Sequence, residues 1–342
     1  GLLERTKIDP ATIEDVIVGC AMPEGEQGLN IGRLVSFIAH LPVTVAGTTV
    51  NRFCGSSMQS VHMAAGAIQL DAGDAFICAG IESMTRIPMG GFNPSPNRGL
   101  VESFPAAYMS MGETAENVAR KYQVTRAEQD AFAATSHRKA ASAQAAGKLA
   151  VEIVPIAGKN GAVDKDGCIR PDTTVEILAG LQPAFDKSGT VTAGSSSPLT
   201  DGAAAMLVCT EEYAKRNKLE PLARVKSIAV AGCPPEIMGI GPVAATKKAL
   251  ARAGLHIKDL DVIELNEAFA SQAIACMREL GIDEAKVNLD GGAIALGHPL
   301  GATGARITGK AAQLLKREGK RYALATQCIG GGQGIATILE QL

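Results

Sequence analysis

The chain alternates short apolar runs with stretches in which apolar residues recur at helical spacing, a pattern that predicts alternating strands and helices. Residues 15–19 (Asp-Val-Ile-Val-Gly) form one such run, and residues 47–51 form a second. Residues 56–70 have helical spacing, and residues 75–79 follow as a further strand. This part of the chain is therefore predicted to be a strand–turn–helix–strand unit.

A similar succession is found near the end of the chain. Residues 286–289 lead as a short strand into a glycine-rich segment, residues 301–318 predict a helix, and residues 321–326 predict a strand. We therefore expect two related α/β halves. Open α/β sheets build their sites at strand ends, so reactive side chains are expected there.

Residues 85–199 interrupt this rhythm. Prolines at positions 88, 94, 96 and 105 mark a long irregular excursion, and helices are predicted around residues 114–122 and 126–146. An insertion of this length is more often a lid or a binding subdomain than a passive loop.

Composition supports packed α/β layers and excludes several classes of partner. Of 342 residues, 46% are hydrophobic and only 4% aromatic, and 38 glycines supply turns. The length predicts more than one packed unit. The net charge of −2 gives no positive field that would attract nucleic acid. No apolar run approaches the roughly 20 residues that span a bilayer, so no membrane span is expected.

The cysteines indicate free thiols rather than a metal site. They stand at positions 20, 54, 78, 168, 209, 233, 276 and 328, with no Cys-x-x-Cys pair and no histidines at zinc-ligand spacing. Cys78 and Cys209 lie in apolar runs and are interpreted as small buried hydrophobic residues. Scattered free thiols are typical of a reducing compartment.

Cys54 is the first candidate for chemistry, because it stands between a predicted strand and a predicted helix, just before Gly-Ser-Ser. The dipole of that helix and its free N–H groups are expected to favour the thiolate. The alternative is one more buried thiol.

His298 and Cys328 each belong to a glycine-rich segment, Gly-Gly-Ala-Ile-Ala-Leu-Gly-His-Pro-Leu-Gly-Ala-Thr-Gly-Ala-Arg and Cys-Ile-Gly-Gly-Gly-Gln-Gly respectively. Glycine permits tight turns and the close approach of other groups, so both side chains are predicted to be held at turns. The other histidines, at positions 40, 62, 137 and 256, lie in ordinary helix or loop contexts and are interpreted as structural.

Asn266 and Glu267 follow the strand pattern of residues 260–265. An Asn at a strand end can hold a water molecule or donate to an oxyanion. Glu267 can orient neighbouring groups or act as a base. A helix N-cap is the alternative interpretation of both residues.

Six segments occur in an order that is very specific when taken together. They are Asn-Arg-Phe-Cys-Gly-Ser-Ser-Met-Gln-Ser from Asn51, Met-Gly-Glu-Thr-Ala-Glu-Asn-Val-Ala from Met111, Gly-Thr-Val-Thr-Ala-Gly-Ser-Ser-Ser from Gly189, Asn-Glu-Ala-Phe-Ala from Asn266, and the two glycine-rich segments. Over nearly its whole length the chain resembles the thiolase superfamily. The resemblance is closest to the degradative branch, the 3-ketoacyl-CoA thiolases.

The resemblance implies an α/β fold with two related βαβ-type halves in a layered α-β-α-β-α core and an inserted loop domain. The implied N-terminal half is residues 1–84 and 200–218, the loop or CoA-binding domain is residues 85–199, and the C-terminal half is residues 219–342. The family normally opens with a further strand and helix that carry an Arg-Thr-Pro turn. These precede the position of Gly1, so we expect the first half to be incomplete at its start.

The implied reaction is the reversible thiolytic cleavage of a 3-ketoacyl-CoA by CoA, which gives acetyl-CoA and a shortened acyl-CoA. His298 would help to form the thiolate of Cys54, which attacks the 3-keto carbon. Cys328 would protonate the departing acetyl-CoA carbanion and later deprotonate the incoming CoA. Two thiols are needed because one holds the acyl group while the other moves the proton.

The resemblance also implies two oxyanion sites and a set of CoA contacts. His298 and a water held by Asn266 would stabilise the enolate, and the backbone N–H groups of Cys54 and Gly330 would hold the tetrahedral oxygen. CoA is the expected co-substrate, with no permanently bound cofactor and no metal. Its contacts would be Ser197 on the pantetheine arm, Arg170 near the adenine end, and Phe185, Met111, Ala268 and Phe269 along the tunnel.

Ser110 stands where the acetoacetyl-CoA-specific branch tends to have His, which favours the broader branch used in fatty-acid β-oxidation. The alternatives are an acetoacetyl-CoA thiolase, a decarboxylating ketoacyl synthase, which would pair its Cys with two His, and an inactive acyl-CoA-binding protein. The family implies a homodimer or homotetramer, with a multifunctional β-oxidation enzyme as a candidate partner. We expect a bacterial-type cytoplasmic location, and mitochondrial and peroxisomal locations stay open.

Overall fold

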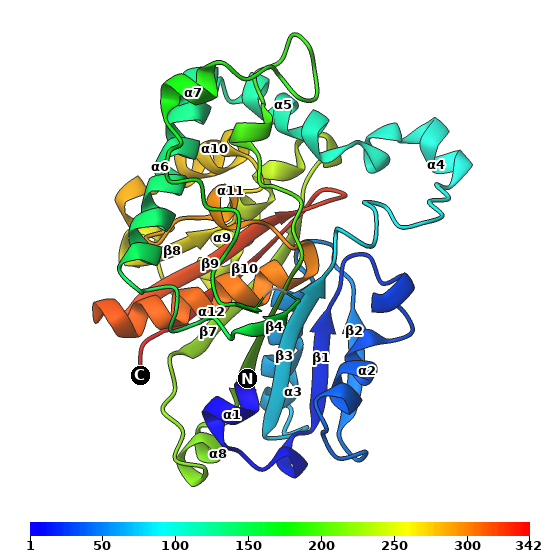
Figure 1. Cartoon of the computed structure of the whole chain (residues 1–342), viewed down its shortest axis with the longest axis vertical. Helices are drawn as coiled ribbons and strands as arrows, with labels where there is room; N and C mark the ends of the chain where they lie inside the picture. Colours follow the sequence, from blue (N-terminus) through cyan, green and yellow to red (C-terminus); the bar gives the residue numbers. More distant parts are fainter. Residues whose placement is uncertain (160) are drawn as a thin grey trace.

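The structure, a computed structural model, describes residues 1–159 and 161–342 and contains two four-stranded sheets with helices on and between them (Figure 1). The first sheet has the order β2-β1-β3-β6, formed by β1 (Asp15–Gly19), β2 (Ala46–Val50), β3 (Ala75–Glu82) and β6 (Gly202–Cys209). The second has the order β7-β10-β9-β8, formed by β7 (Arg224–Gly232), β8 (Val262–Leu265), β9 (Tyr322–Ile329) and β10 (Gln333–Glu340). The predicted α/β class is thus confirmed.

Two long helices, α3 (Ser56–Gln69) and α12 (Leu300–Glu318), pack against each other and against the two sheets. Other helices cover the outer faces: α2 (Ile31–Ile38) packs on the first sheet, and α9 (Gly241–Ala253) packs on the second, with α10 (Ala270–Leu280) beside α9. Short helices α1 (Leu2–Thr6), α8 (Glu211–Arg216) and α11 (Ala293–Leu296) complete the two halves. None of the described helices has the length and apolar composition needed to cross a membrane.

Neighbouring residues of a strand belong to different parts of the core, because side chains alternate across a sheet. In β9, Leu324 packs in a cluster with α9 and α10, whereas Ala323 and Ala325 pack with α12. In β1, Val16 packs with α2 and Ile17 packs with α3. Strands that are apolar on both faces therefore read as continuous hydrophobic runs in the sequence.

The two sheets share a pairing pattern. Strand β1 runs parallel to β3, which pairs antiparallel with β6. In the same way, β8 runs parallel to β9, which pairs antiparallel with β10. Helix α3 precedes β3 as α12 precedes β9. Strand β7 covers the outer edge of β10, whereas within the described residues no strand pairs with the corresponding edge of β6.

Most predicted elements are confirmed. The strands predicted at residues 15–19, 47–51 and 75–79 correspond to β1, β2 and β3, and the helix predicted at 56–70 is α3. The strand predicted at 286–289 is wrong, because only Val287 makes an isolated bridge, to Ile263. Asn288 has a φ of +46° and its side chain hydrogen-bonds the backbone N–H and C=O of Leu265. The Asn288 side chain therefore takes up the backbone hydrogen bonds of Leu265 that a strand over residues 286–289 would need for pairing.

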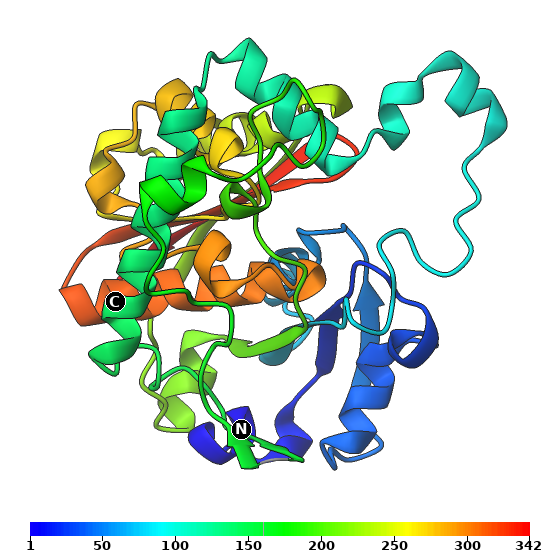
Figure 2. The same ribbon diagram turned by 45° about the horizontal axis from the view of Figure 1, so that its top comes forward.

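Residues 85–199 lie mainly over the end of the second half (Figures 1 and 2). Their elements are α4 (Arg98–Ser103), α5 (Met111–Lys121), α6 (Arg126–Ala145), the hairpin of β4 (Ile156–Gly158) and β5 (Gly161–Val163), and α7 (Val175–Ala179). The predicted helices around 114–122 and 126–146 are therefore confirmed. Helix α4 stands away from the body in both views.

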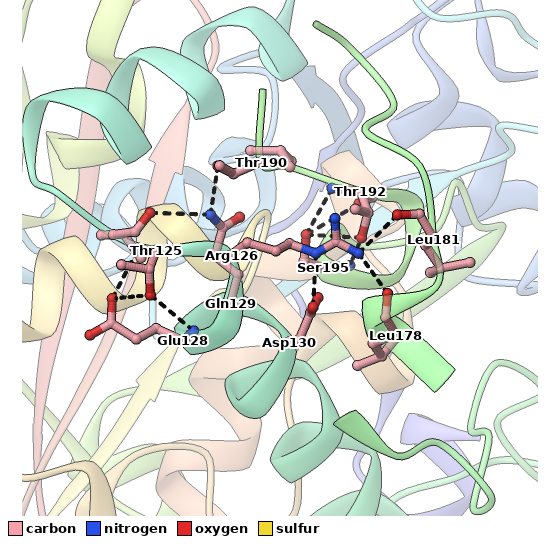
Figure 3. A network of polar contacts seen from close by, with 12 residues as sticks. Thr125, Arg126, Glu128, Gln129, Asp130, Leu178, Leu181, Thr190, Thr192 and Ser195 are labelled. Atoms are coloured by element: carbon pink, nitrogen blue, oxygen red, sulfur yellow. Dashed lines mark hydrogen bonds and ion pairs between the residues drawn. The ribbon is translucent and has the colours of Figure 1, made fainter. Parts of the chain in front are cut away.

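A polar network fastens the segment after α7 to α6. Figure 3 shows Arg126 reaching from α6 to the carbonyl oxygens of Leu178 and Leu181, at 2.6 and 2.9 Å. Gln129, on the same helix, donates to the Thr190 hydroxyl at 2.9 Å. These contacts hold residues 178–195 in place on a rigid element, close to the point where the chain returns to the first sheet.

Glycines allow α3, α12 and β3 to approach one another at the backbone level. A Cβ on Gly80 in β3 would overlap the carbonyl oxygen of Gly301 and lie 2.6 Å from the Cα of Ala302, both in α12. A Cβ on Gly66 in α3 would meet no heavy atom within 4 Å. Gly80 is therefore needed for the close packing of β3 on α12, whereas Gly66 could carry a side chain without a clash.

We predict that Gly80→Ala destabilises the protein by about 2 kcal/mol, the usual cost of overpacking a close contact. The matched control, Gly66→Ala, is expected to be neutral or to stabilise by about 0.5–1 kcal/mol through helix propensity. Urea unfolding followed by circular dichroism measures both. Equal effects of the two substitutions would contradict the close packing of β3 on α12.

Candidate active site

Cys54 lies at the elbow between β2 and α3, one residue before Gly55, the N-cap of α3. The turn requires Phe53 to adopt a φ of +43°, and Asn51 supports it by accepting the Phe53 N–H at 2.8 Å. The carbonyl of Cys54 accepts a hydrogen bond from the side chain of Gln327 in β9. The elbow predicted from the sequence is confirmed, and it is fixed to the strand that carries Cys328.

The sulfur of Cys54 is buried, and burial raises its pKa to about 11. Hydrogen bonds from the backbone N–H groups of Gly330 and of Cys54 itself act in the opposite direction and lower the pKa. The backbone N–H groups thus act in the direction that favours the thiolate, but desolvation outweighs them and raises the pKa. Cys54 needs a base to become a nucleophile.

His298 lies just before α12 and is 5% exposed. Its Nδ1 is 2.7 Å from the Thr303 hydroxyl, and its Nε2 is 3.4 Å from the Nδ2 of Asn266. Since an amide nitrogen can only donate, Nε2 accepts and the ring proton sits on Nδ1, which donates to Thr303. Burial lowers the pKa of His298 to about 3, so the ring is neutral. A neutral imidazole with an acceptor nitrogen can serve as a base.

Asn266 and Glu267 are buried at the end of β8. The Oδ1 of Asn266 has no hydrogen-bond partner among the described residues. Glu267 accepts from the Ser136 hydroxyl at 2.6 Å, the Asn288 amide at 2.7 Å and the Ile294 N–H at 3.2 Å. Neither residue caps α10, whose N-cap is Phe269. Glu267 thus orients the segment that leads to His298.

Cys328 is buried in β9, within a cluster that contains Ala268 and Phe269 and against which Met111 packs. Burial raises the pKa of Cys328 well above its usual value, and the nearby Cys54 sulfur raises it further. Gly330 follows on the same strand end, and a Cβ there would lie 3.4 Å from the Met111 sulfur. The structure therefore brings the two thiols and the predicted apolar wall together, and His298 stands two residues before Leu300, which packs with Cys54.

The remaining predicted contacts lie farther out. Phe185 is half exposed and packs edge-on against Phe269, with ring centres 5.9 Å apart. The Ser197 N–H donates to the Ala268 carbonyl at 3.0 Å, which places it beside the apolar wall. Arg170 is exposed and contacts α6 through its backbone N–H, which donates to His137 at 3.1 Å. Ser110 uses its hydroxyl in the capping box of α5 with Glu113.

Thr303, Gln327 and Glu82 belong to this region but were not predicted. Thr303 follows His298 by five residues on the next helix, a spacing that could have suggested a contact. Gln327 reaches Cys54 from 273 residues away, and nothing local in the sequence signals this. Glu82 ends β3, a strand-end position like those of the predicted residues. In the described part of the chain, no three or more His, Cys, Asp or Glu side chains gather as metal ligands would.

The arrangement defines a class of enzyme. Two buried thiols, a neutral imidazole and two backbone amides directed at one sulfur are the parts of an acyl transfer through a cysteine nucleophile. The chain belongs to the thiolase family: the model of the thiolase N-terminal domain matches residues 1–212, and that of the C-terminal domain matches residues 219–341. This membership confirms the resemblance drawn from the motifs.

Relatives agree along the whole chain. The 3-ketoacyl-CoA thiolase of Bacillus subtilis (strain 168) is 51% identical over 351 residues, which cover 99% of this chain and 90% of the relative. The 3-ketoacyl-CoA thiolase of Shewanella sp. (strain ANA-3) is 51% identical over 353 residues, which cover all of this chain and 90% of the relative.

We predict that Thr303→Val lowers the rate of transfer of an acyl group to the enzyme about tenfold or more, because His298 loses the partner that fixes its tautomer. Thr308→Val is the matched control, since among the described residues the Thr308 hydroxyl bonds only the Gly304 carbonyl of the same helix, at 2.7 Å. Rapid-quench measurement of acyl-enzyme formation compares the two. Equal rates in the two variants would show that Thr303 does not orient His298.

Proposed function

We propose that the chain is an acetyl-CoA acyltransferase that cleaves 3-ketoacyl-CoA thioesters with CoA. The observation that carries this proposal is the proximity of the Cys54 and Cys328 thiols, together with His298 two residues before Leu300, which packs in the same buried cluster as Cys54. The names of relatives at 51% identity support the same substrate class. Fatty-acid degradation is the corresponding process.

In the first half-reaction, Nε2 of His298 takes the thiol proton of Cys54, and the thiolate attacks the 3-keto carbon. The bond between the second and third carbons of the substrate then breaks, and its electron pair stays on the acetyl-CoA fragment. Cys328 gives its proton to that fragment, which leaves as acetyl-CoA. The thiolate of Cys328 and the protonated His298 remain, so atoms and charge balance.

In the second half-reaction, the Cys328 thiolate takes the thiol proton of CoA. The CoA thiolate attacks the acyl group on Cys54, the bond between the acyl carbon and the Cys54 sulfur breaks, and the shortened acyl-CoA leaves. His298 returns its proton to Cys54, which restores the neutral resting site. The raised pKa values of both thiols suit this exchange, because each holds its proton until a partner is ready.

Two sets of donors suit the oxygens that become negative. The backbone N–H groups of Cys54 and Gly330 act on the Cys54 sulfur and lower its pKa, which supports their proposed role as donors to an acyl oxygen bound there. Asn266, whose Oδ1 is buried without a partner among the described residues, can hold a water that shares the enolate oxygen with His298. These roles stay predictions from the motifs and the geometry.

CoA is proposed to approach along Ser197, Phe185, Met111, Ala268 and Phe269. The contacts of Phe269 with Phe185 and the position of Met111 against Cys328 support an apolar passage to the thiols. Arg170 is proposed to lie near the adenine end, and its exposure suits a contact with phosphate. Residues 85–199 would then form the CoA-binding loop domain. The N-terminal half would consist of residues 1–84 and 200–218, and the C-terminal half of residues 219–342.

We propose the five-layered thiolase core for the whole fold. Helices α3 and α12 between the sheets, with α2 and α9 outside, support it. The edge of β6 is the position at which a further strand could add, by analogy with β7 on β10. We also propose that the chain forms a homodimer or homotetramer, that it has a multifunctional β-oxidation enzyme as a partner, and that it is cytoplasmic. CoA is proposed as the co-substrate, with no permanently bound cofactor.

We predict that acetyl-CoA labels Cys54 of the wild-type protein, and that mass spectrometry locates the acetyl group there. Cys54→Ser is expected to abolish the label, and Cys328→Ser is expected to lower turnover by about 100-fold or more, the usual contribution of a general acid or base. Cys209→Ser is the control, since Cys209 lies at the opposite end of β6 from the site. A folded wild-type protein without label would favour the inactive acyl-CoA-binding alternative.

We further predict that kcat/KM for a long-chain 3-ketoacyl-CoA equals or exceeds that for acetoacetyl-CoA. The motivation is Ser110, which caps α5 next to Met111 and leaves the tunnel without the His of the acetoacetyl-CoA branch. The rates of thiolytic cleavage of the two substrates are compared by monitoring the loss of absorbance of the magnesium enolate of each 3-ketoacyl-CoA. A strict preference for the four-carbon substrate would assign the chain to the acetoacetyl-CoA branch instead.

A further inference from the structure

Glu82 is a buried carboxylate that the proposed mechanism does not use. It ends β3, is 1% exposed, and lies between the two halves of the molecule. Its Oε2 accepts hydrogen bonds from the N–H groups of Ala21 and Gly301, both at 2.8 Å. One oxygen atom thus joins the loop after β1 to the first turn of α12.

The second oxygen, Oε1, is equally occupied. It accepts from the side chain of Gln27 at 2.6 Å and from the Met22 N–H at 3.2 Å. Gln27 is itself fixed, since its amide also donates to the Met22 carbonyl and its oxygen accepts the Ser83 N–H at 2.9 Å. Four N–H donors converge on two oxygens, so both oxygens of the carboxyl group are used as acceptors.

The segments that Glu82 binds also pack against Cys54, the proposed nucleophile. Ala21 and Leu300 form one buried cluster with Cys54, against which Met22 packs. Leu300 stands next to Gly301 and two residues after His298. The carboxylate therefore ties down the segment on either side of Cys54, one segment from each half.

The absence of a side chain at Gly301 allows the carboxylate of Glu82 to approach its backbone. A Cβ on Gly301 would lie 2.8 Å from Oε2 of Glu82 and 2.7 Å from the Cα of Cys20. The carboxylate also faces the N-terminal end of α12, where a negative charge is favourable. The negative charge of Glu82 works against a thiolate at Cys54, whose pKa it raises. A residue that disfavours the nucleophile electrostatically has to contribute through geometry.

We propose that Glu82 is a positioning residue that sets the distance between the Cys54 elbow and the His298 segment by clamping Ala21, Met22 and Gly301. The proposal rests on the proposed roles of Cys54 and His298. Because both of those residues act within the acyl-transfer step, misplacing them affects that step, whereas substrate binding along α5 and residues 178–199 is untouched.

The test is Glu82→Gln in the full chain. A glutamine amide presents an NH2 group to one of the two donor pairs, so at least two hydrogen bonds are lost while the shape is kept. We expect kcat and the rate of acyl-Cys54 formation to fall about 10- to 100-fold, the cost of a misplacement of about 1 Å, with KM within about twofold of wild type. An unchanged kcat in the folded variant, or a loss confined to KM, would overturn the proposal.

Gln27→Met keeps the test decisive if Glu82→Gln does not fold. It removes a single donor to Glu82 and leaves the Ala21 and Gly301 bonds, so the same kcat-selective loss is expected at a smaller size of about two- to fivefold. No loss of kcat in a folded Gln27→Met, together with an unfolded Glu82→Gln, would assign Glu82 to stability alone and so reject a positioning role.

Glu116→Gln is the matched control. Glu116 is also 1% exposed and accepts from the backbone N–H groups of Thr190 and Val191, at 2.8–3.0 Å, in the loop region. A comparable fall in Tm is expected, but the loss of activity should appear as a raised KM rather than a lowered kcat, because Glu116 and residues 190–191 belong to the proposed binding region. Wild-type protein that forms no acyl-Cys54 would reject the proposed function, whereas normal acylation in both wild type and Glu82→Gln would reject only the role of Glu82.

Discussion

The close packing of α3 against α12 is the constraint on which the site depends. Gly304 lies against the backbone of Met58, where a Cβ would overlap it, and the Ala305 N–H donates to the Ser57 hydroxyl at 2.8 Å. Cys54 precedes the first of these helices and His298 precedes the second. Their separation is therefore set by backbone-to-backbone contact between two rigid elements, which is more exact than contact through flexible side chains.

This packing also buries the reactive side chains away from solvent, and that burial determines their protonation states before reaction. Burial raises the pKa of Cys54 and of Cys328 and lowers that of His298, so two thiols and an imidazole rest without charge. Charge then develops only during reaction. Fixed donors such as the Gly330 amide are worth more in such a medium than in water, because no solvent has to reorganise around them.

Most of the helices and strands could be predicted from the sequence because their signals are local. Apolar runs predict β1 and β3, and helical spacing predicts α3 and α12. The candidates likewise rest on local signals, Cys54 on its place between a strand and a helix, and His298 and Cys328 on their glycine-rich segments. The rest depends on contacts between distant segments. Glu82 meets Gly301 across 219 residues, and Asn288 turns residues 286–289 away from strand pairing through the backbone of Leu265. The extent to which desolvation raises the pKa of Cys54 is equally hidden in the sequence, since its burial comes from both halves.

The glycine-rich segment around His298 is a packing motif as much as a chemical one. Gly297 has a φ of +96°, which turns the chain into His298, and Gly292 has room only for the carboxylate of Glu267 where a Cβ would stand. Gly301 and Gly304 instead admit neighbours, namely Glu82 and the backbone of α3. One short segment thus receives a carboxylate on each side of His298, one from each half. The glycines thus set the course of the backbone around His298, while the Thr303 hydroxyl and the Asn266 amide hold its ring at Nδ1 and Nε2.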